Sequence, residues 1–81
     1  MENINDKIKE LTLMLLYLFS WEENEVGMKY RRSWKGYDFD VLNELAEEEL
    51  INDGRRSKSV SFNDIGIEKA LELLKKYNIE I

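Results

Sequence analysis

Residues 50–62 read LINDGRRSKSVSF, and the order of residue types in this stretch predicts a β-hairpin. The Asp53–Gly54 pair signals a two-residue turn, because both central positions of a type I′ turn need a positive φ angle. A longer loop through Arg55–Lys58 is the alternative. In the returning strand Val60 and Phe62 share one face, and the intervening serines lie on the other.

Amphipathic helices are predicted on both sides of this hairpin. The helix before it begins at Asp38, which is expected to cap its N-terminus. Its buried stripe consists of Phe39, Leu42, Leu45, Ala46 and Leu50. The helix after the hairpin begins near Asn63 or Asp64. Its core face consists of Ile67, Leu71, Leu74 and Tyr77.

Residues 29–37 read KYRRSWKGY and carry four bases and three aromatic side chains. In a helix, Tyr30, Trp34 and Tyr37 would share one face at the i, i+4, i+7 spacing, and the basic side chains would point away from it. Gly36 favours a turn and limits the length of the helix. We therefore expect a short amphipathic helix here, with Trp34 assigned mainly to packing.

A longer first helix is predicted from about Ile4 to Ser20. At the i, i+3, i+7, i+10 spacing, one of its faces carries Ile8, Leu11, Leu15 and Leu18. Its other faces are also apolar, and a helix that is apolar nearly all round is buried on more than one side. Because 81 residues can cover only part of that surface, we expect a homodimer that packs through this helix. A central core helix without a partner is the alternative.

The order helix, short helix, helix, two-stranded wing, helix resembles a winged helix-turn-helix. Residues 42–51 (LNELAEEELI) and 58–70 (KSVSFNDIGIEKA) are similar to the helix end, wing strands and capped last helix of that group. Asn63 stands where a threonine usually caps the last helix, and Glu49 stands where many members have glycine.

A narrower resemblance comes from residues 31–51, RRSWKGYDFDVLNELAEEELI. They are similar to a family of small bacterial proteins of unknown function that share a W-K-G-aromatic-D-aromatic-D-x-L core. The likeness extends from about Asp6 to Tyr77. It implies one winged-helix-like domain over residues 1–81, of the α+β class and mostly α, but it implies no activity, because a fold alone does not give a function.

Composition excludes several kinds of site. The chain has no cysteine and no histidine, which removes disulfides, thiol nucleophiles, the usual zinc sites and histidine-based catalysis. The four glycines are isolated, so there is no phosphate-binding loop. We expect no catalytic residue, no metal and no cofactor, and a chain that is not an enzyme. The longest apolar run has seven residues, and a bilayer span needs about 20. With an acidic, polar N-terminus, a cytoplasmic protein without a membrane partner is expected.

Positive charge is concentrated in two short segments, although the formal net charge is −5. Residues 29–36 and 54–60 together hold seven bases and no acid, whereas residues 37–53 hold seven acids and no base. In a winged helix the two basic segments flank the duplex, where loops and helix ends hold phosphates. Double-stranded DNA is therefore the first predicted partner. Phosphate contacts are assigned to Lys29, Arg31, Arg32, Lys35, Arg55, Arg56 and Lys58, and base contacts to Tyr37 and Asn43.

A protein-interaction module is the alternative to DNA binding. The presumed recognition helix is rich in carboxylates, which would repel DNA: Asp40, Glu44, Glu47 and Glu48. Tyrosine, tryptophan and arginine, which are frequent in residues 30–37, are enriched in binding hot spots. An acidic segment of a partner, or the acidic helix of a neighbouring copy, could satisfy the arginines. This alternative requires that Trp34 is exposed.

Overall fold

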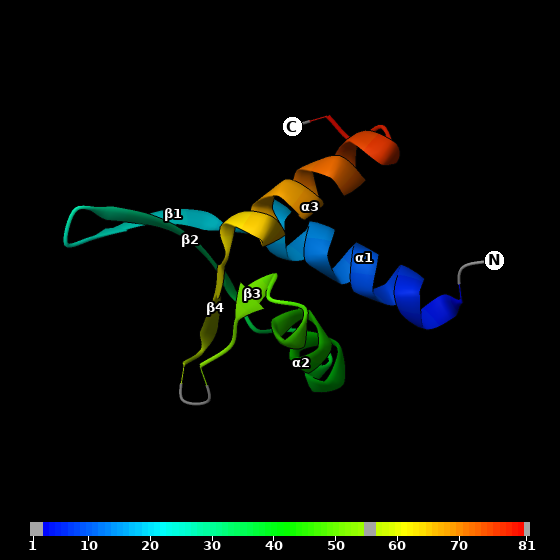
Figure 1. Ribbon diagram of the computed structural model, residues 1–81, viewed down its shortest axis with the longest axis horizontal. Helices are drawn as coiled ribbons and strands as arrows, with labels where there is room; N and C mark the ends of the chain where they lie inside the picture. Colours follow the sequence, from blue (N-terminus) through cyan, green and yellow to red (C-terminus); the bar gives the residue numbers. More distant parts are fainter. Residues whose placement is uncertain (1–2, 55–56, 81) are drawn as a thin grey trace.

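The computed structural model describes residues 3–54 and 57–80, and within them helices alternate with two β-hairpins (Figure 1). The elements are α1 (Ile4–Leu18), β1 (Trp21–Glu25), β2 (Met28–Trp34), α2 (Phe39–Glu47), β3 (Ile51–Asn52), β4 (Ser59–Phe62) and α3 (Asp64–Lys76). The α+β class predicted from the sequence is confirmed. So are the three longer helices and the second hairpin.

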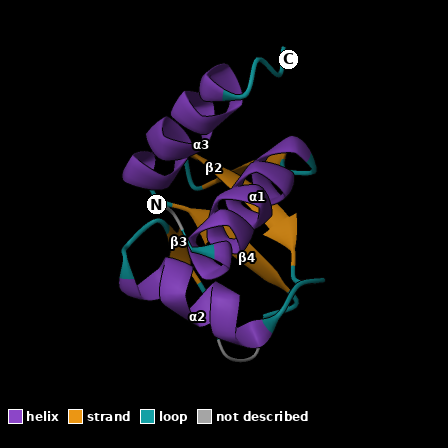
Figure 2. Ribbon diagram, turned by 90° about the vertical axis from the view of Figure 1, so that its right-hand side faces the viewer, coloured by secondary structure: helices purple, strands orange, loops and turns teal. Residues whose placement is uncertain are grey.

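The strands form one antiparallel sheet in the order β1-β2-β4-β3. Side chains alternate between the faces of a sheet, and the register pairs Ser33 with Val60 and Ile51 with Phe62. All four residues are buried on the face that the described helices cover (Figure 2). The opposite face is called the open face below. It carries Trp21, Tyr30, Arg32, Trp34, Ser59 and Ser61.

The hydrophobic core lies between the sheet and the three helices. Its fully buried side chains include Leu13 and Leu16 of α1 and Leu42 and Leu45 of α2. In α3 the buried positions are Gly66, Ala70, Leu73 and Leu74. The predicted core positions Leu71 of α3 and Phe39 of α2 are wrong, because these side chains are 42% and 72% exposed. The residues of α1 predicted to share one face, Ile8, Leu11, Leu15 and Leu18, lie together on the side of the helix away from this core and are each at least 40% exposed.

The short helix predicted for residues 29–37 is wrong, because most of this segment is strand β2. Val26 and Gly27, with φ angles of 48° and 78°, form the turn that joins β2 to β1, and positive φ at both central positions suits a two-residue hairpin. β2 then pairs with β1 on one side and β4 on the other. A short isolated helix would gain few such bonds. Two strands therefore separate α1 from α2, and the layout differs from the predicted helix, short helix, helix.

The predicted hairpin at residues 50–62 has the longer of its two expected loops. Asn52 pairs with Ser61, so a two-residue turn at Asp53–Gly54 is wrong. The backbone N–H of Ser57 instead donates to the carbonyl of Gly54 at 3.1 Å. Arg55 and Arg56 lie outside the described residues.

The two predicted helix caps have different outcomes. Asp38 caps α2 as expected, because its carboxylate accepts from the N–H groups of Asp40 and Val41. Asn63 occupies the N-cap position of α3 without making the side-chain cap bond. Its amide donates to the carbonyl of Glu49 at 2.8 Å and accepts from Asn52 at 2.8 Å. The Asn63 side chain therefore ties the start of α3 to the segment that follows α2.

Glu49 ends α2 in the left-handed conformation, with a φ angle of 62°. The N–H of Leu50 bonds to the carbonyl of Leu45, and that of Glu49 to the carbonyl of Ala46, which is the Schellman pattern of a helix end. The winged-helix resemblance places glycine at this position in many members. The backbone here takes the glycine-like geometry although the residue is glutamate.

Replacing Glu49 with glycine is expected to raise the free energy of unfolding by about 0.5–1 kcal/mol, because glycine adopts positive φ without steric cost. The Glu49 side chain is exposed, so little packing is lost. Urea denaturation followed by circular dichroism measures the change. Asn78 ends α3 with a φ angle of 58°, and asparagine tolerates this region. Asn78→Gly should therefore give the smaller gain, and an equal gain at both positions would contradict the explanation.

Candidate interaction surfaces

The two arginines of β2 point to opposite faces of the sheet. On the helix side, Arg31 donates from Nε to Ser20 Oγ at 2.8 Å and from Nη2 to the Ser20 carbonyl at 3.1 Å. Its guanidinium also lies 5.2 Å from the centre of the Tyr17 ring. On the open face, Arg32 donates to Ser59 Oγ at 2.8 Å and forms an ion pair with Glu23 at 3.5 Å. The strand geometry therefore separates two bases that are adjacent in sequence.

The lysines of the first basic segment have carboxylate neighbours within the same chain. Lys29 lies 3.8 Å from Glu22 on the adjacent strand. Lys35 forms an ion pair with Asp53, and its Nζ donates to the carbonyl of Gly54 at 2.7 Å. Both partners of the Lys35–Asp53 pair are mostly buried, with side chains 13% and 15% exposed. Part of the positive charge predicted for phosphate contacts is thus neutralised by the chain itself.

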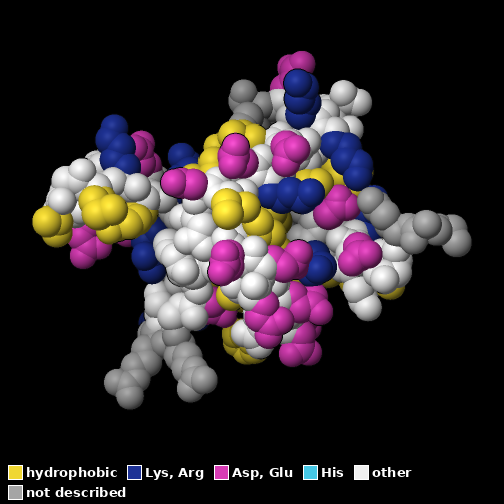
Figure 3. Space-filling model, in the orientation of Figure 1, with side chains coloured by type: hydrophobic (Ala, Val, Ile, Leu, Met, Phe, Trp, Pro, Cys, Tyr) yellow, Lys and Arg dark blue, Asp and Glu magenta, His cyan; other side chains and the backbone are white. Residues whose placement is uncertain are grey.

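The remaining predicted nucleic-acid contacts are dispersed. Lys58 is exposed, and its carbonyl accepts from the N–H of Lys35 at 3.0 Å, so the structure brings these two lysines together. Tyr37 is half-buried and packs against the core. Asn43 is exposed on α2, over which acidic side chains gather (Figure 3). Neither predicted base contact therefore lies on the basic strand, since Tyr37 is in the loop after β2 and Asn43 is on α2.

Trp34 is not part of the core. Its side chain is 62% exposed, so the assignment of this residue mainly to packing is wrong. Its ring centroid lies 4.8 Å from that of Trp21, with the two planes tilted by 46°. Trp34 also borders a surface hollow together with Phe19. The exposed Trp34 meets the requirement set for the protein-interaction alternative. Sequence reasoning missed Trp21 and Phe19, because neither lies in the periodic patterns that were used.

A continuous apolar stripe runs along the outer side of α1. It consists of Ile4, Ile8, Leu11, Leu15 and Leu18, which are between 40% and 71% exposed, and it is called the α1 stripe below. The intervals between these residues alternate between four and three, which is the heptad spacing of a helix–helix seam. From Leu11 to Phe19 the sequence contains no charged residue. Phe19 extends the stripe with a ring that is 71% exposed.

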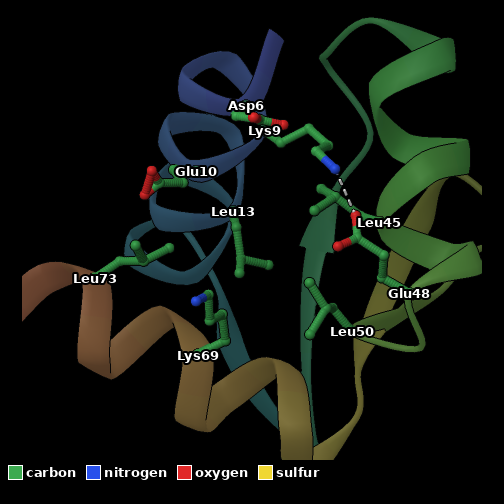
Figure 4. A pocket seen from close by; sticks show the side chains of 9 residues that line it. All are labelled: Asp6, Lys9, Glu10, Leu13, Leu45, Glu48, Leu50, Lys69 and Leu73. Carbon is green, nitrogen blue, oxygen red and sulfur yellow. Dashed lines mark hydrogen bonds and ion pairs between the residues drawn. The ribbon is translucent and has the colours of Figure 1, made fainter. Parts of the chain in front are cut away.

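A small pocket of about 170 Å³ lies between α1, α3 and the end of α2 (Figure 4). Its lining combines buried leucines with charged residues: Asp6, Lys9, Glu10, Leu13, Leu45, Glu48, Leu50, Lys69 and Leu73. Lys9 donates to Glu48 at 2.9 Å, and this hydrogen bond raises the pKa of Lys9 above its ordinary value. At alkaline pH the contribution of the Lys9 charge is therefore full up to the ordinary lysine pKa of about 10.4 and is lost as the pH rises through the higher pKa of the folded chain.

The described part of the chain contains no group of three or more acidic residues placed to hold a metal ion. Within the same residues, no helix has the length and apolar character needed to cross a bilayer. The described surfaces that carry exposed apolar, aromatic or basic side chains include the α1 stripe, the open face of the sheet and the basic residues near the β3–β4 loop.

Comparison with known proteins gives a family but no activity. Residues 4–80 match the model of a domain of unknown function, DUF6429. The chain belongs to the DUF6429 family. The chain is also 35% identical over 77 residues to "Uncharacterized protein y4hR" of Sinorhizobium fredii. The aligned residues cover 94% of this chain and 95% of that protein. No solved structure matches the chain.

The sequence-based expectation of a family without an assigned function is thus confirmed for this DUF6429 chain. The winged-helix arrangement and the W-K-G core motif stay predictions. The assignments of DNA, of a homodimer and of the individual contact residues stay predictions as well.

Proposed function

We propose that this chain is a protein-interaction module that associates with a second copy of itself through the α1 stripe. The main support is the stripe itself: five large apolar side chains at heptad spacing, all at least 40% exposed, on a helix whose other side is already in the core. Contiguous exposed apolar surface of this kind marks interaction sites on soluble proteins. The stripe also lies on the helix for which the sequence predicted a partner chain, although the sequence did not say which face would meet it.

The exposed area of the chain is consistent with a missing partner. A compact monomer of this 9.7 kDa mass exposes about 5,100 Å², whereas this chain exposes 6071 Å². The excess is roughly 950 Å², and each partner in a standard protein interface buries about 800 Å². The projecting β1–β2 hairpin contributes part of this excess area (Figure 1). The exposed area therefore agrees with an interface but does not show where on the chain it lies.

Charge and sheet edges favour the stripe over the other routes to self-association. Two copies with a net charge of −5 each repel one another. The electrostatic repulsion at close approach is smallest along the uncharged half of α1. The edge strand β1 carries Glu22, Glu23 and Glu25, and charges on an edge strand oppose strand-to-strand pairing. The opposite edge strand, β3, has only two residues.

Sedimentation equilibrium over about a hundredfold range of concentration tests the proposal. We expect the mass to rise from 9.7 kDa towards twice that value as concentration increases. Added salt should strengthen the dimer slightly, because screening weakens repulsion between two acidic chains while apolar burial is kept. A chain that stays monomeric throughout, at low and at high salt, would contradict the proposal.

DNA binding in a winged-helix manner is the second candidate. DNA binding is favoured by Lys58, which is exposed next to the segment whose sequence contains Arg55 and Arg56. In this interpretation β3 and β4 serve as the wing and α2 enters the groove. Fluorescence anisotropy with a random-sequence duplex tests it. Engagement of five phosphates would make log K fall with log salt at a slope of about −4.5, which is the opposite salt response to that of the dimer. A cytoplasmic location is part of both proposals.

A further inference from the structure

We infer that the two copies pair through α1 in antiparallel orientation, so that Phe19 of each copy fills the hollow beside Ile8 and Val41 of the other. This inference rests on the proposed self-association and adds its geometry. It makes the contact isologous, as in most two-fold dimers, because the same patch serves both copies.

The heptad spacing of the α1 stripe sets which residues meet. In an antiparallel pair centred between Leu11 and Leu15, Leu11 lies opposite the partner's Leu15 and Ile8 lies opposite the partner's Leu18. All four positions are 40–48% exposed in the single chain. This register uses every residue of the predicted face and leaves Phe19 about 1.5 Å along the axis from the level of the partner's Ile8. Side chains at this spacing pack as knobs into the spaces of the facing helix.

The two ends of the stripe have complementary shapes. At the C-terminal end Phe19 protrudes, and Trp34 borders the same surface. At the N-terminal end there is a hollow between α1 and the start of α2. It is lined by Asn5, Ile8, Asp38, Asp40, Val41 and Glu44. Antiparallel pairing places each Phe19 over the partner's hollow, whereas parallel pairing would set the two protruding ends against each other and leave both hollows unfilled.

Charge favours the same orientation. The hollow is rimmed by Asp38, Asp40 and Glu44. Antiparallel pairing keeps the acidic rims of the two copies at opposite ends of the interface, whereas parallel pairing brings them together. Antiparallel helices also place opposite ends of their dipoles side by side.

Disulfide cross-linking tests the orientation cleanly, because the chain has no cysteine of its own. Three samples are oxidised with diamide: Ile8→Cys alone, Leu18→Cys alone, and an equal mixture of the two variants. In the antiparallel register, two copies of residue 8 lie about 15 Å apart along the helix axis, which is beyond disulfide reach. We expect cross-linked dimers in the mixture and few in either single variant.

The outcomes separate this inference from the proposed function. Efficient cross-linking of Ile8→Cys with itself, in a chain that sediments as a dimer, would overturn the antiparallel orientation and leave self-association standing. A chain that sediments only as a monomer would overturn both. Circular dichroism spectra that match the parent chain establish that each variant is folded, which the partial exposure of both positions favours.

A double-mutant cycle tests the contact between Phe19 and the hollow. Phe19→Ala is expected to weaken the dimer at least about tenfold, and Val41→Phe, which fills the hollow, should weaken it similarly. The double variant should be little worse than either single one, because both changes remove the same contact. Val26→Ala is the matched control, since Val26 is 96% exposed at the tip of the β1–β2 hairpin. Additive losses from the two changes would contradict the contact.

Discussion

Replacing Gly66 with alanine is expected to lower the free energy of unfolding by at least about 3 kcal/mol, a large part of the total for a chain of this size. A Cβ atom at this position would overlap the carbonyl oxygen of Leu50 and lie 2.8 Å from its carbonyl carbon. Both are backbone atoms. The same carbonyl accepts a hydrogen bond from the N–H of Asn63 at 3.1 Å. The start of α3 therefore cannot move away without losing its attachment to the segment after α2.

Helix propensity alone predicts the opposite sign for Gly66→Ala, because alanine is favoured over glycine inside a helix by about 1 kcal/mol. The measured sign thus decides between local propensity and tertiary contact. Gly36→Ala is the control, since a Cβ there meets no atom within 4 Å, and it should change stability by less than about 0.5 kcal/mol. Urea denaturation of the two variants gives the comparison. A stabilised Gly66→Ala variant would show that α3 does not approach Leu50 this closely.

Replacing Leu11 with glutamate is expected to convert the dimer into a monomer, with an increase in Kd of at least about a hundredfold. Leu11 lies in the middle of the α1 stripe and is 48% exposed in the single chain. In the dimer its replacement would place an unpaired carboxylate in an apolar contact, and desolvating a charge without a partner is costly. The isolated chain should tolerate the change, because glutamate suits an exposed helical position.

Leu71→Glu is the matched control for Leu11→Glu. Leu71 has a similar exposure of 42%, but it lies on α3 and outside the α1 stripe. Sedimentation equilibrium should therefore show a dimer for Leu71→Glu and a monomer for Leu11→Glu, while circular dichroism shows both to be folded. Equal dimerisation of the two variants would place the interface elsewhere on the molecule.

The candidate surfaces were only partly predictable from the sequence. The face of Ile8, Leu11, Leu15 and Leu18 follows from helical periodicity, and the small size of the domain predicted a partner for some part of this helix. Only the structure shows that this face is the exposed one. The basic residues were a different matter. Lys35 pairs with Asp53, which is far away in the chain, and Arg31 and Arg32 turn to opposite faces once their segment becomes a strand. No local pattern contains these relations, because they depend on which strands pair.

Local chemistry along the chain determined the three longer helices, the second hairpin, the α2 cap at Asp38 and the exclusion of cysteine and histidine chemistry. Each of these depends on neighbouring residues, on periodicity or on composition. Only the tertiary structure decided that residues 28–34 are a strand, that Trp34 is exposed, and that Gly66 lies against Leu50. The sequence of residues 29–37 is compatible with helix and strand alike. The choice between them was made by hydrogen bonds to β1 and β4, which no short segment can form alone.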